Sequence, residues 1–202
     1  MRIALKRKKH EVQRHPGNTG KMVFTLLLVF LSVLTLVLTT PRFLYRPSER
    51  VAHTIQQCAQ EEHISASLLE AVILTESKFN EKAKSHVGAV GMMQLMPETA
   101  DWISEMSGLP ADNLESPEQN IPLGAWYLNY LLKKYKNNEI FALAAYNAGR
   151  GNVDEWIEKN KWTETFSEVE KIPFPETREF VKSVVSNRNR LEEEKKVAAG
   201  GR

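Results

Sequence analysis

The segment 22–38 (MVFTLLLVFLSVLTLVL) is the feature of this sequence that most restricts its structure. It carries no charge, and only Thr25, Ser32 and Thr35 in it are not apolar. As an α-helix rising about 1.5 Å per residue, it would span about 25 Å, close to the thickness of the hydrocarbon core of a bilayer. A helix packed on a soluble core would show a polar stripe, which is absent. We therefore predict a transmembrane helix within residues 22–40.

Charge is distributed unevenly about this segment. Residues 1–21 hold seven Lys or Arg and one Glu, which gives +6, and because the whole chain carries +2, the remainder carries −4. Cations before the apolar segment predict that residues 1–21 are a basic cytoplasmic tail and that the chain after Thr39 lies outside the cell membrane. The part large enough to fold is acidic, which excludes a basic nucleic-acid-binding domain.

A cleaved signal peptide is the alternative to an anchor. The residues after the apolar segment, 39–42 (TTPR), lack the small-x-small cleavage pattern, and the segment is longer than a usual signal-peptide core. Cys58, the single cysteine, lies too far downstream for lipid attachment and excludes an internal disulfide. We expect an uncleaved single-pass anchor with an extracytoplasmic domain.

The rest of the chain divides into a stalk (41–50), one domain (51–190) and a polar, solvated tail (191–202). Apolar spacing predicts helices at 51–62, 67–77, 98–106, 121–136, 140–147, 153–159 and 177–189. The stretch between Lys78 and Pro97 has no helical period and predicts a small irregular or β-like tongue. The expected fold class is mainly α: a single helical domain with this tongue, preceded by one transmembrane helix.

Glu76 is a candidate catalytic group. It follows Val72 and Ile73 at helical spacing and so continues an apolar face near a helix end. A carboxyl in apolar surroundings has a raised pKa, as a general acid working near neutral pH requires. The same spacing also fits a solvated acid at a frayed helix end, and spacing alone leaves both interpretations open.

The segment 88–97 (GAVGMMQLMP) follows closely. Gly88 and Gly91 permit tight turns or the close approach of another backbone or a ligand. Gln94, a neutral donor and acceptor among apolar residues, suits recognition of an amide or hydroxyl, or a hydrogen bond that closes the core.

The sequence lacks the motifs of several other kinds of catalytic or binding site. The segment 149–151 (GRG) is too short for a phosphate loop and receives no role. The histidines share no metal-ligand spacing, and neither a GxSxG nor an HExxH motif occurs. We expect neither a metal nor a cofactor.

Four segments resemble, in order, the motifs of the soluble-type lytic transglycosylases (the SLT domain): 76–100, 120–128, 145–149 and 172–178. The resemblance covers nearly all of 51–185. It implies an α+β lysozyme-like fold and cleavage of the β-1,4 bond between N-acetylmuramic acid and N-acetylglucosamine in peptidoglycan. It also implies that Glu76 is the single catalytic acid/base and that the glycan site contains Ser85, Gly91, Gln94, Met96, Tyr146, Asn147 and Glu176.

The family reaction needs one carboxyl. It protonates the leaving oxygen and then accepts the proton of the C6 hydroxyl that attacks C1, which gives a 1,6-anhydro sugar. Most glycosidases use two carboxylates, and Glu176 is the nearest candidate for a second one. The Thr-Arg after Glu176 favours instead a structural ion pair or hydrogen bond. One departure is Phe180, where the family usually has Tyr; it removes a hydrogen bond and makes the surroundings of Glu76 more apolar.

Three alternatives stay open at this point. One is a lysozyme-type hydrolase on the same fold, the second a peptidoglycan-binding scaffold with weak activity, and the third a membrane adaptor that uses its acidic surface. The predicted partners are peptidoglycan glycan strands and the membrane, with no nucleic acid. The sequence does not predict an oligomeric state.

Overall fold

The computed structural model describes residues 24, 26–32, 35 and 45–200. The chain divides into two units, Met1–Leu44 and Tyr45–Arg202. In the first unit the described residues are helical and exposed, and Ser32 Oγ donates to the Val29 carbonyl at 2.8 Å. Among the described residues no helix has the length and hydropathy to cross a bilayer. The predicted basic tail, and most of the predicted transmembrane segment, lie outside the described residues.

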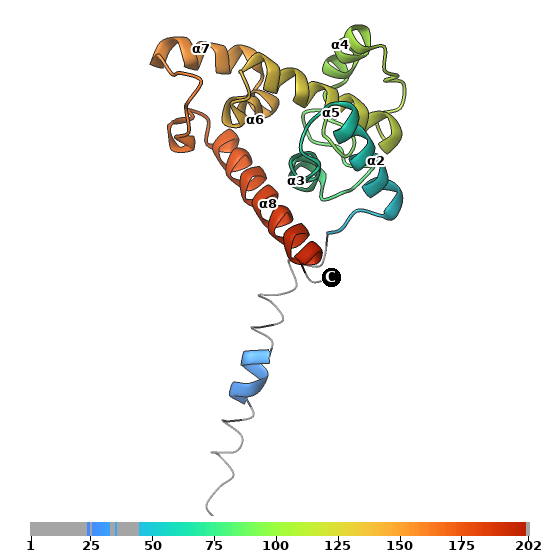
Figure 1. The fold of residues 1–202 in the computed structure, drawn as a ribbon, viewed down its shortest axis with the longest axis vertical. Helices are drawn as coiled ribbons and strands as arrows, with labels where there is room; N and C mark the ends of the chain where they lie inside the picture. The colour runs from blue at the N-terminus through green and yellow to red at the C-terminus, as the bar shows by residue number, and fades with distance from the viewer. Residues whose placement is uncertain (1–23, 25, 33–34, 36–44, 201–202) are drawn as a thin grey trace, which may run out of the picture. The chain divides into compact units, whose positions relative to one another are not determined.

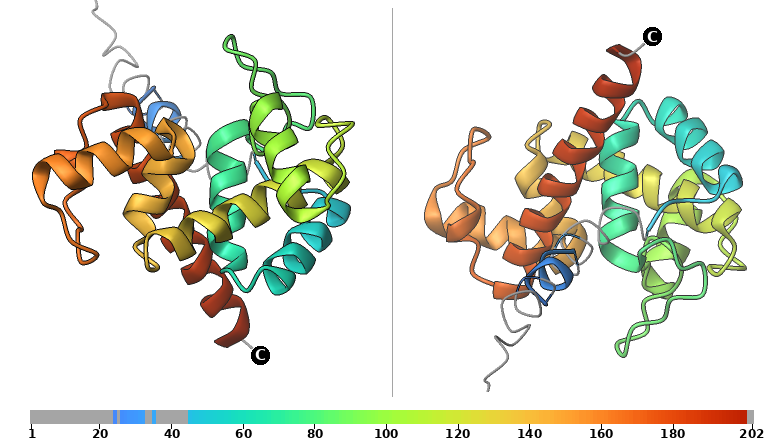
Figure 2. Two further views of the ribbon diagram at one scale, coloured as in Figure 1. Left: turned by 90° about the horizontal axis from the view of Figure 1, so that it is seen from above. Right: turned by 90° about the horizontal axis from the view of Figure 1, so that it is seen from below.

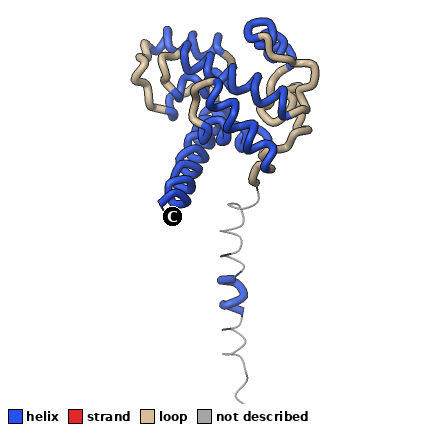
Figure 3. Tube along the Cα trace, turned by 45° about the vertical axis from the view of Figure 1, so that its right-hand side comes forward, coloured by secondary structure: helices blue, strands red, loops and turns tan. Residues whose placement is uncertain are grey.

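The second unit is built of α-helices joined by loops (Figures 1 and 3). In chain order the elements are α2 (Glu49–Glu61), α3 (Ala66–Ser77), α4 (Pro97–Ser107), α5 (Pro117–Lys134), α6 (Glu139–Ala148), α7 (Arg150–Asn160), the 3₁₀ helix η2 (Val169–Lys171) and α8 (Pro175–Gly200). Each of the seven predicted helices is present, with boundaries shifted by a few residues at most ends. The prediction of a mainly α domain is confirmed.

Local sequence explains where these helices begin. The side chains of Ser48, Ser65 and Asn138 accept hydrogen bonds from first-turn N–H groups of α2, α3 and α6. Proline opens α4 and α5, where its missing N–H is no loss. Because Pro117 opens it, α5 begins four residues before the predicted start at 121.

The core is centred on α3, which packs against α8 and lies beside it in Figure 1. The middle of α3 is buried over more than the single face that its spacing predicted, since Ala71, which lies outside that face, is also buried, while Glu70 is half-buried. From α8, the side chains Phe180, Val181, Val184 and Leu191 are buried as well. The helix α5 packs on α2, α4 and α6, and α6 packs on α7 and α8. Glu76 therefore stands at the end of a helix enclosed by the rest of the domain.

The predicted tongue is the loop 78–96 between α3 and α4, which projects beyond the helices (Figure 2). It contains two isolated antiparallel bridges, Lys84 with Val90 and Val90 with Leu95, and the described residues form no longer strand. The prediction of a small irregular or β-like insert is confirmed.

Asn120 of α5 attaches the tongue to the helices. Its side chain is fully buried, its Oδ1 accepts from the Met93 N–H at 2.7 Å, and its Nδ2 donates to the Val90 carbonyl at 3.0 Å. Gly91 lies against this amide with φ +81°, and a Cβ there would collide with Asn120 and with the Leu114 carbonyl. The sequence predicted that Gly91 permits a tight turn or the close approach of another backbone or a ligand. In the structure the groups that approach Gly91 closely belong to the protein itself.

The C-terminal residues 193–200 are exposed, as the expected solvated tail requires, but they are helical. The helix α8 continues without interruption past residue 190 to Gly200, and Leu191 is buried. Lys195 Nζ donates to Ser67 Oγ at 3.0 Å and lies 3.4 Å from the Glu70 carboxylate, so this part of α8 contacts α3.

We predict that Asn120→Ala lowers the free energy of unfolding by about 2 kcal/mol, because it leaves the buried Met93 N–H without a partner and removes one of the two hydrogen bonds to the Val90 carbonyl, whose other donor is the Leu95 N–H. Urea denaturation measures this change. The matched control is Asn189→Ala, at an exposed site on α8, which should change stability by less than about 0.5 kcal/mol. Equal effects of the two substitutions would contradict the anchoring role of Asn120.

Candidate active site

Glu76 lies in the last turn of α3, half-buried. Burial raises the pKa of its carboxyl to about 8, and the nearby charge of Glu176 adds to the shift. The chain leaves the helix through Lys78 and Phe79, two successive non-glycine residues with φ of 54° and 64°. Left-handed backbone at such residues is strained and commonly occurs beside functional groups. Of the two interpretations of Glu76, the structure supports the carboxyl in apolar surroundings.

Tyr146 of α6 connects three elements beside Glu76. Its hydroxyl donates to the Met93 carbonyl in the tongue at 2.8 Å, and its ring stacks on Phe180 of α8 with centroids 6.4 Å apart. Burial raises the pKa of Tyr146 well above its ordinary value, and the charge of Glu76 raises it further. Tyr146 is therefore a neutral hydrogen-bonding group close to Glu76.

Phe180, the residue that replaces the usual tyrosine, is buried against Tyr146. Without a hydroxyl, it presents only carbon and hydrogen to this part of the molecule. The structure is thus consistent with the expectation of more apolar surroundings near Glu76.

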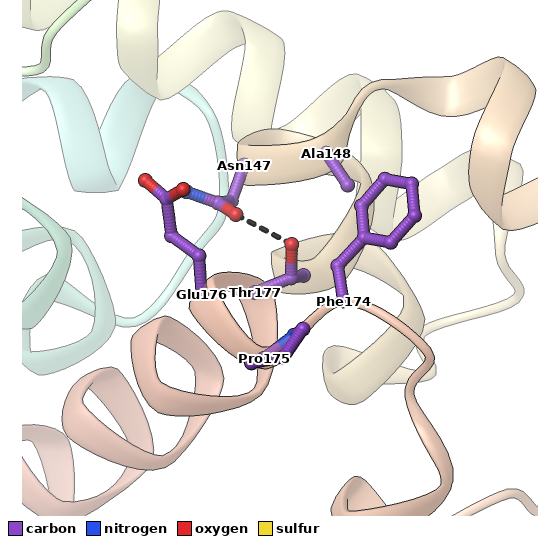
Figure 4. Close-up of a pocket in the computed structure, with 6 residues that line it drawn as sticks. All are labelled: Asn147, Ala148, Phe174, Pro175, Glu176 and Thr177. Atoms are coloured by element: carbon purple, nitrogen blue, oxygen red, sulfur yellow. Dashed lines mark hydrogen bonds between the residues drawn. The ribbon is translucent and has the colours of Figure 1, made fainter.

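Asn147 and Glu176 line a pocket of about 450 Å³ together with Ala148, Phe174, Pro175 and Thr177 (Figure 4). The Thr177 hydroxyl donates to Asn147 Oδ1 at 2.7 Å, which ties the end of α6 to the first turn of α8. This hydrogen bond fixes one wall of the pocket.

Glu176 itself is exposed, in the first turn of α8. Among the described residues its carboxylate has no hydrogen-bond or ion-pair partner, and Arg178 donates instead to the Glu170 carbonyl at 3.2 Å. The interpretation of Glu176 as part of a structural ion pair or hydrogen bond is therefore wrong, and its charge is free to act on Glu76.

The remaining candidates, Ser85, Gln94 and Met96, lie in the tongue. Ser85 Oγ accepts from the Ala89 N–H at 2.9 Å, and Gln94 Nε2 donates to the carbonyls of Ala83 at 3.1 Å and Gly91 at 2.8 Å. Met96 is the residue before α4 and is half-buried. These polar atoms shape the tongue, so the structure supports the interpretation of Gln94 as a residue that closes a packed segment.

The structure thus brings Glu76, Tyr146, Asn147 and Glu176 to one place, while Ser85, Gly91, Gln94 and Met96 belong to the tongue beside it. Two residues of this region carried no predicted role, Asn120 and Thr177. Neither residue had a local signal, because the partners of Asn120 lie 27 and 30 residues away and that of Thr177 lies 30 residues away.

Several named proteins are similar to this chain. It is 44% identical over 128 residues to a soluble lytic murein transglycosylase of Salmonella typhimurium, and 42% identical over 128 residues to that of Escherichia coli K12. Each match covers 61% of this chain and 20% of the relative, so the chain spans about a fifth of these proteins. A membrane-bound lytic murein transglycosylase C of Histophilus somni is 34% identical over 118 residues, 52% of this chain and 32% of that protein.

Solved structures of lytic transglycosylases are also similar to this chain. The 70 kDa soluble lytic transglycosylase of Escherichia coli superposes with a TM-score of 0.65 at 36% identity, over 71% of this chain and 24% of that one. An inactive mutant of the lytic transglycosylase Slt of Pseudomonas aeruginosa gives 0.64 at 30% identity, over 83% and 28%.

The sequence model of the transglycosylase SLT domain matches residues 53–169, more than half of the chain. The matched region contains Glu76, the tongue, Asn120 and Tyr146, and it ends before Glu176. The chain belongs to the transglycosylase SLT domain family.

Proposed function

We propose that this protein is a lytic transglycosylase that cleaves the β-1,4 bond between N-acetylmuramic acid and N-acetylglucosamine in peptidoglycan, with Glu76 as the acid/base. The observation that carries the proposal is the half-buried Glu76 carboxyl, whose pKa of about 8 keeps it protonated at neutral pH. The murein transglycosylases named above, which share this domain, support the choice of substrate.

The chemistry requires one group to act twice. Protonated Glu76 donates its proton to the glycosidic oxygen as the bond from C1 to that oxygen breaks. The resulting carboxylate accepts the proton of the C6 hydroxyl as the C6 oxygen bonds to C1, so Glu76 ends protonated again. The product is a 1,6-anhydro sugar, and no water is consumed.

A lysozyme-type hydrolase is the second candidate, because one observation favours it. Glu176 is exposed, unpaired among the described residues and close enough to raise the pKa of Glu76, so it could serve as a second carboxylate that activates water. Mass spectrometry of the products separates the reactions, since an anhydro product is one water lighter than a hydrolytic one. Reducing ends alone would establish the hydrolase instead.

We predict that Glu76→Gln lowers the rate of glycan cleavage at least about 100-fold, because the amide can neither donate nor accept the transferred proton. Release of soluble muropeptides from purified peptidoglycan measures this rate. The control is Glu70→Gln on the same helix, which removes the contact with Lys195 and should keep its activity. Cleavage by Glu76→Gln at the wild-type rate would contradict the role of Glu76. A wild-type protein that binds strands without cutting them would favour the scaffold.

We predict that kcat/KM falls as the pH rises through about 8, because the reaction begins with protonated Glu76. Glu176→Gln removes a nearby negative charge, which lowers the pKa of Glu76, so the fall should begin at a lower pH. Burial is the larger cause, so the pKa should stay above the ordinary value of 4.5. Glu179→Gln, at an exposed acid further along α8, serves as control and should leave the profile in place. An unchanged profile for Glu176→Gln would refute the coupling.

We propose further that residues 22–40 form a single-pass anchor, with residues 1–21 in the cytoplasm and the enzyme domain outside the cell membrane. The uncharged segment after a basic tail supports this. The domain carries net negative charge, as does its proposed polymer substrate, so Coulomb attraction does not bring them together. A tether would instead raise the effective concentration of the enzyme at the wall.

A protein that begins at Tyr45 should retain the activity of the full chain on soluble glycan strands, because it keeps the Ser48 cap of α2 and the whole core. In cells it should leave the membrane fraction in which the full chain is found. Fractionation followed by immunoblotting measures this. A full chain that itself separates with the soluble fraction would contradict the anchor, without bearing on the catalytic proposal.

A further inference from the structure

Three aromatic side chains from α4 and α5 form a group outside the pocket of Figure 4. Trp102, Trp126 and Tyr130 are all half-buried. Their ring centroids lie 5.3 Å apart for Trp102 and Tyr130, 5.7 Å for Trp126 and Tyr130, and 5.8 Å for the two tryptophans. These separations are typical of favourable ring contacts. We refer to the three residues as the aromatic platform.

Arg150, the first residue of α7, lies on this platform. Its guanidinium carbon is 4.4 Å from the ring centroid of Trp102 and 5.3 Å from that of Tyr130, and Nη1 donates to the Tyr130 hydroxyl at 2.8 Å. Cation–π contact and this hydrogen bond hold the guanidinium in one place. The sequence assigned no role to Arg150, whose position between two glycines fitted no known motif.

The charge of Arg150 has no carboxylate partner among the described residues. The acid one turn further along α7, Asp154, is already held by Lys134 at 2.9 Å and by the Tyr135 hydroxyl at 3.0 Å. By contrast, Arg188 pairs with Glu139 at 2.9 Å. A guanidinium has five N–H donors in a planar fork that matches a carboxylate. Arg150 therefore has donors to spare for an anion.

Arg150 is also accessible. It is half-buried rather than enclosed, so part of its side chain is exposed to solvent.

The platform adjoins the candidate active site through Tyr127. This ring lies 6.1 Å from Trp102 and 5.5 Å from Tyr146, between centroids. The charge of Arg150 acts to lower the pKa of Tyr127, and the charge of Glu76 raises the pKa of Tyr146. Two ring contacts thus connect the platform with Tyr146, which stands beside Glu76.

Building on the proposed function, we propose that Arg150, held on the aromatic platform, binds a carboxylate of the peptide stem on the strand whose sugars lie at Glu76. Muramic acid carries such stems, and they extend to the side of the glycan. In an acidic domain, a stacked guanidinium that has no carboxylate partner among the described residues provides the local positive charge that a stem carboxylate requires. Arg150 would then determine which stems the enzyme accepts, while Glu76 performs the chemistry.

The test compares three soluble substrates with the full chain: strands with carboxylate stems, the same strands with the stem carboxylates converted to carboxamides, and strands stripped of stems. The wild type should cut the carboxylate form with the highest kcat/KM. Arg150→Gln should lower the ratio of kcat/KM between carboxylate and carboxamide strands by about tenfold, the loss of one charge-assisted hydrogen bond. The control Arg190→Gln, which breaks a surface pair with Glu194, should leave that ratio unchanged.

Tyr130→Phe provides a second variant if Arg150→Gln fails to fold, as circular dichroism would show. It removes the hydroxyl that orients the guanidinium and should lower the same ratio by a smaller factor. A wild type that does not distinguish the two stems, or an Arg150→Gln that slows all three substrates alike, would overturn the inference and leave the proposed function intact. A wild type that cuts none of the three would overturn the proposed function itself.

Discussion

The packing of α3 against α8 is the contact on which the candidate active site depends. Because α3 is enclosed by the domain, the residue in its last turn cannot be fully solvated, and Glu76 has a raised pKa. The start of α8, with Glu176 and Thr177, is joined to the end of α6 by the hydrogen bond from Thr177 to Asn147. The helix α8 therefore contributes both to the burial of α3 and to the wall of the pocket.

Burial and like charge act on Glu76 in the same direction, and burial is the larger cause. This matters for the choice between mechanisms. A carboxyl protonated mainly by apolar surroundings needs no second carboxylate to serve as an acid, which suits a reaction that uses one group twice. Phe180, stacked on Tyr146, adds to those surroundings without offering a hydrogen bond.

The tongue is held by polar groups rather than by a sheet. Asn120, Gln94 and Ser85 satisfy its backbone groups, and Gly91 permits the close approach of Asn120. A segment too short for a strand ladder pairs part of its backbone with itself, as in the Gly91 N–H that donates to the Ala83 carbonyl at 2.9 Å, and part with side chains. Several residues that resemble a ligand-binding motif therefore have a structural role here that does not depend on any ligand.

The sequence alone predicted the helices and the tongue, because these depend on local periodicity and on the absence of a period between Lys78 and Pro97. Spacing made Glu76 only a candidate, and its predicted role came from the resemblance to the family motifs. The uncharged segment that follows the basic tail predicts a membrane anchor, and this stays a prediction. Local patterns could not reveal that Glu176 lacks an ion-pair partner among the described residues, that Thr177 binds Asn147, or that α8 continues to Gly200 and contacts α3 through Lys195. Nor could they show that Arg150 lies on Trp102 and Tyr130. Each of these features depends on residues far apart in the chain, and only the packing of the helices decides which distant side chains meet.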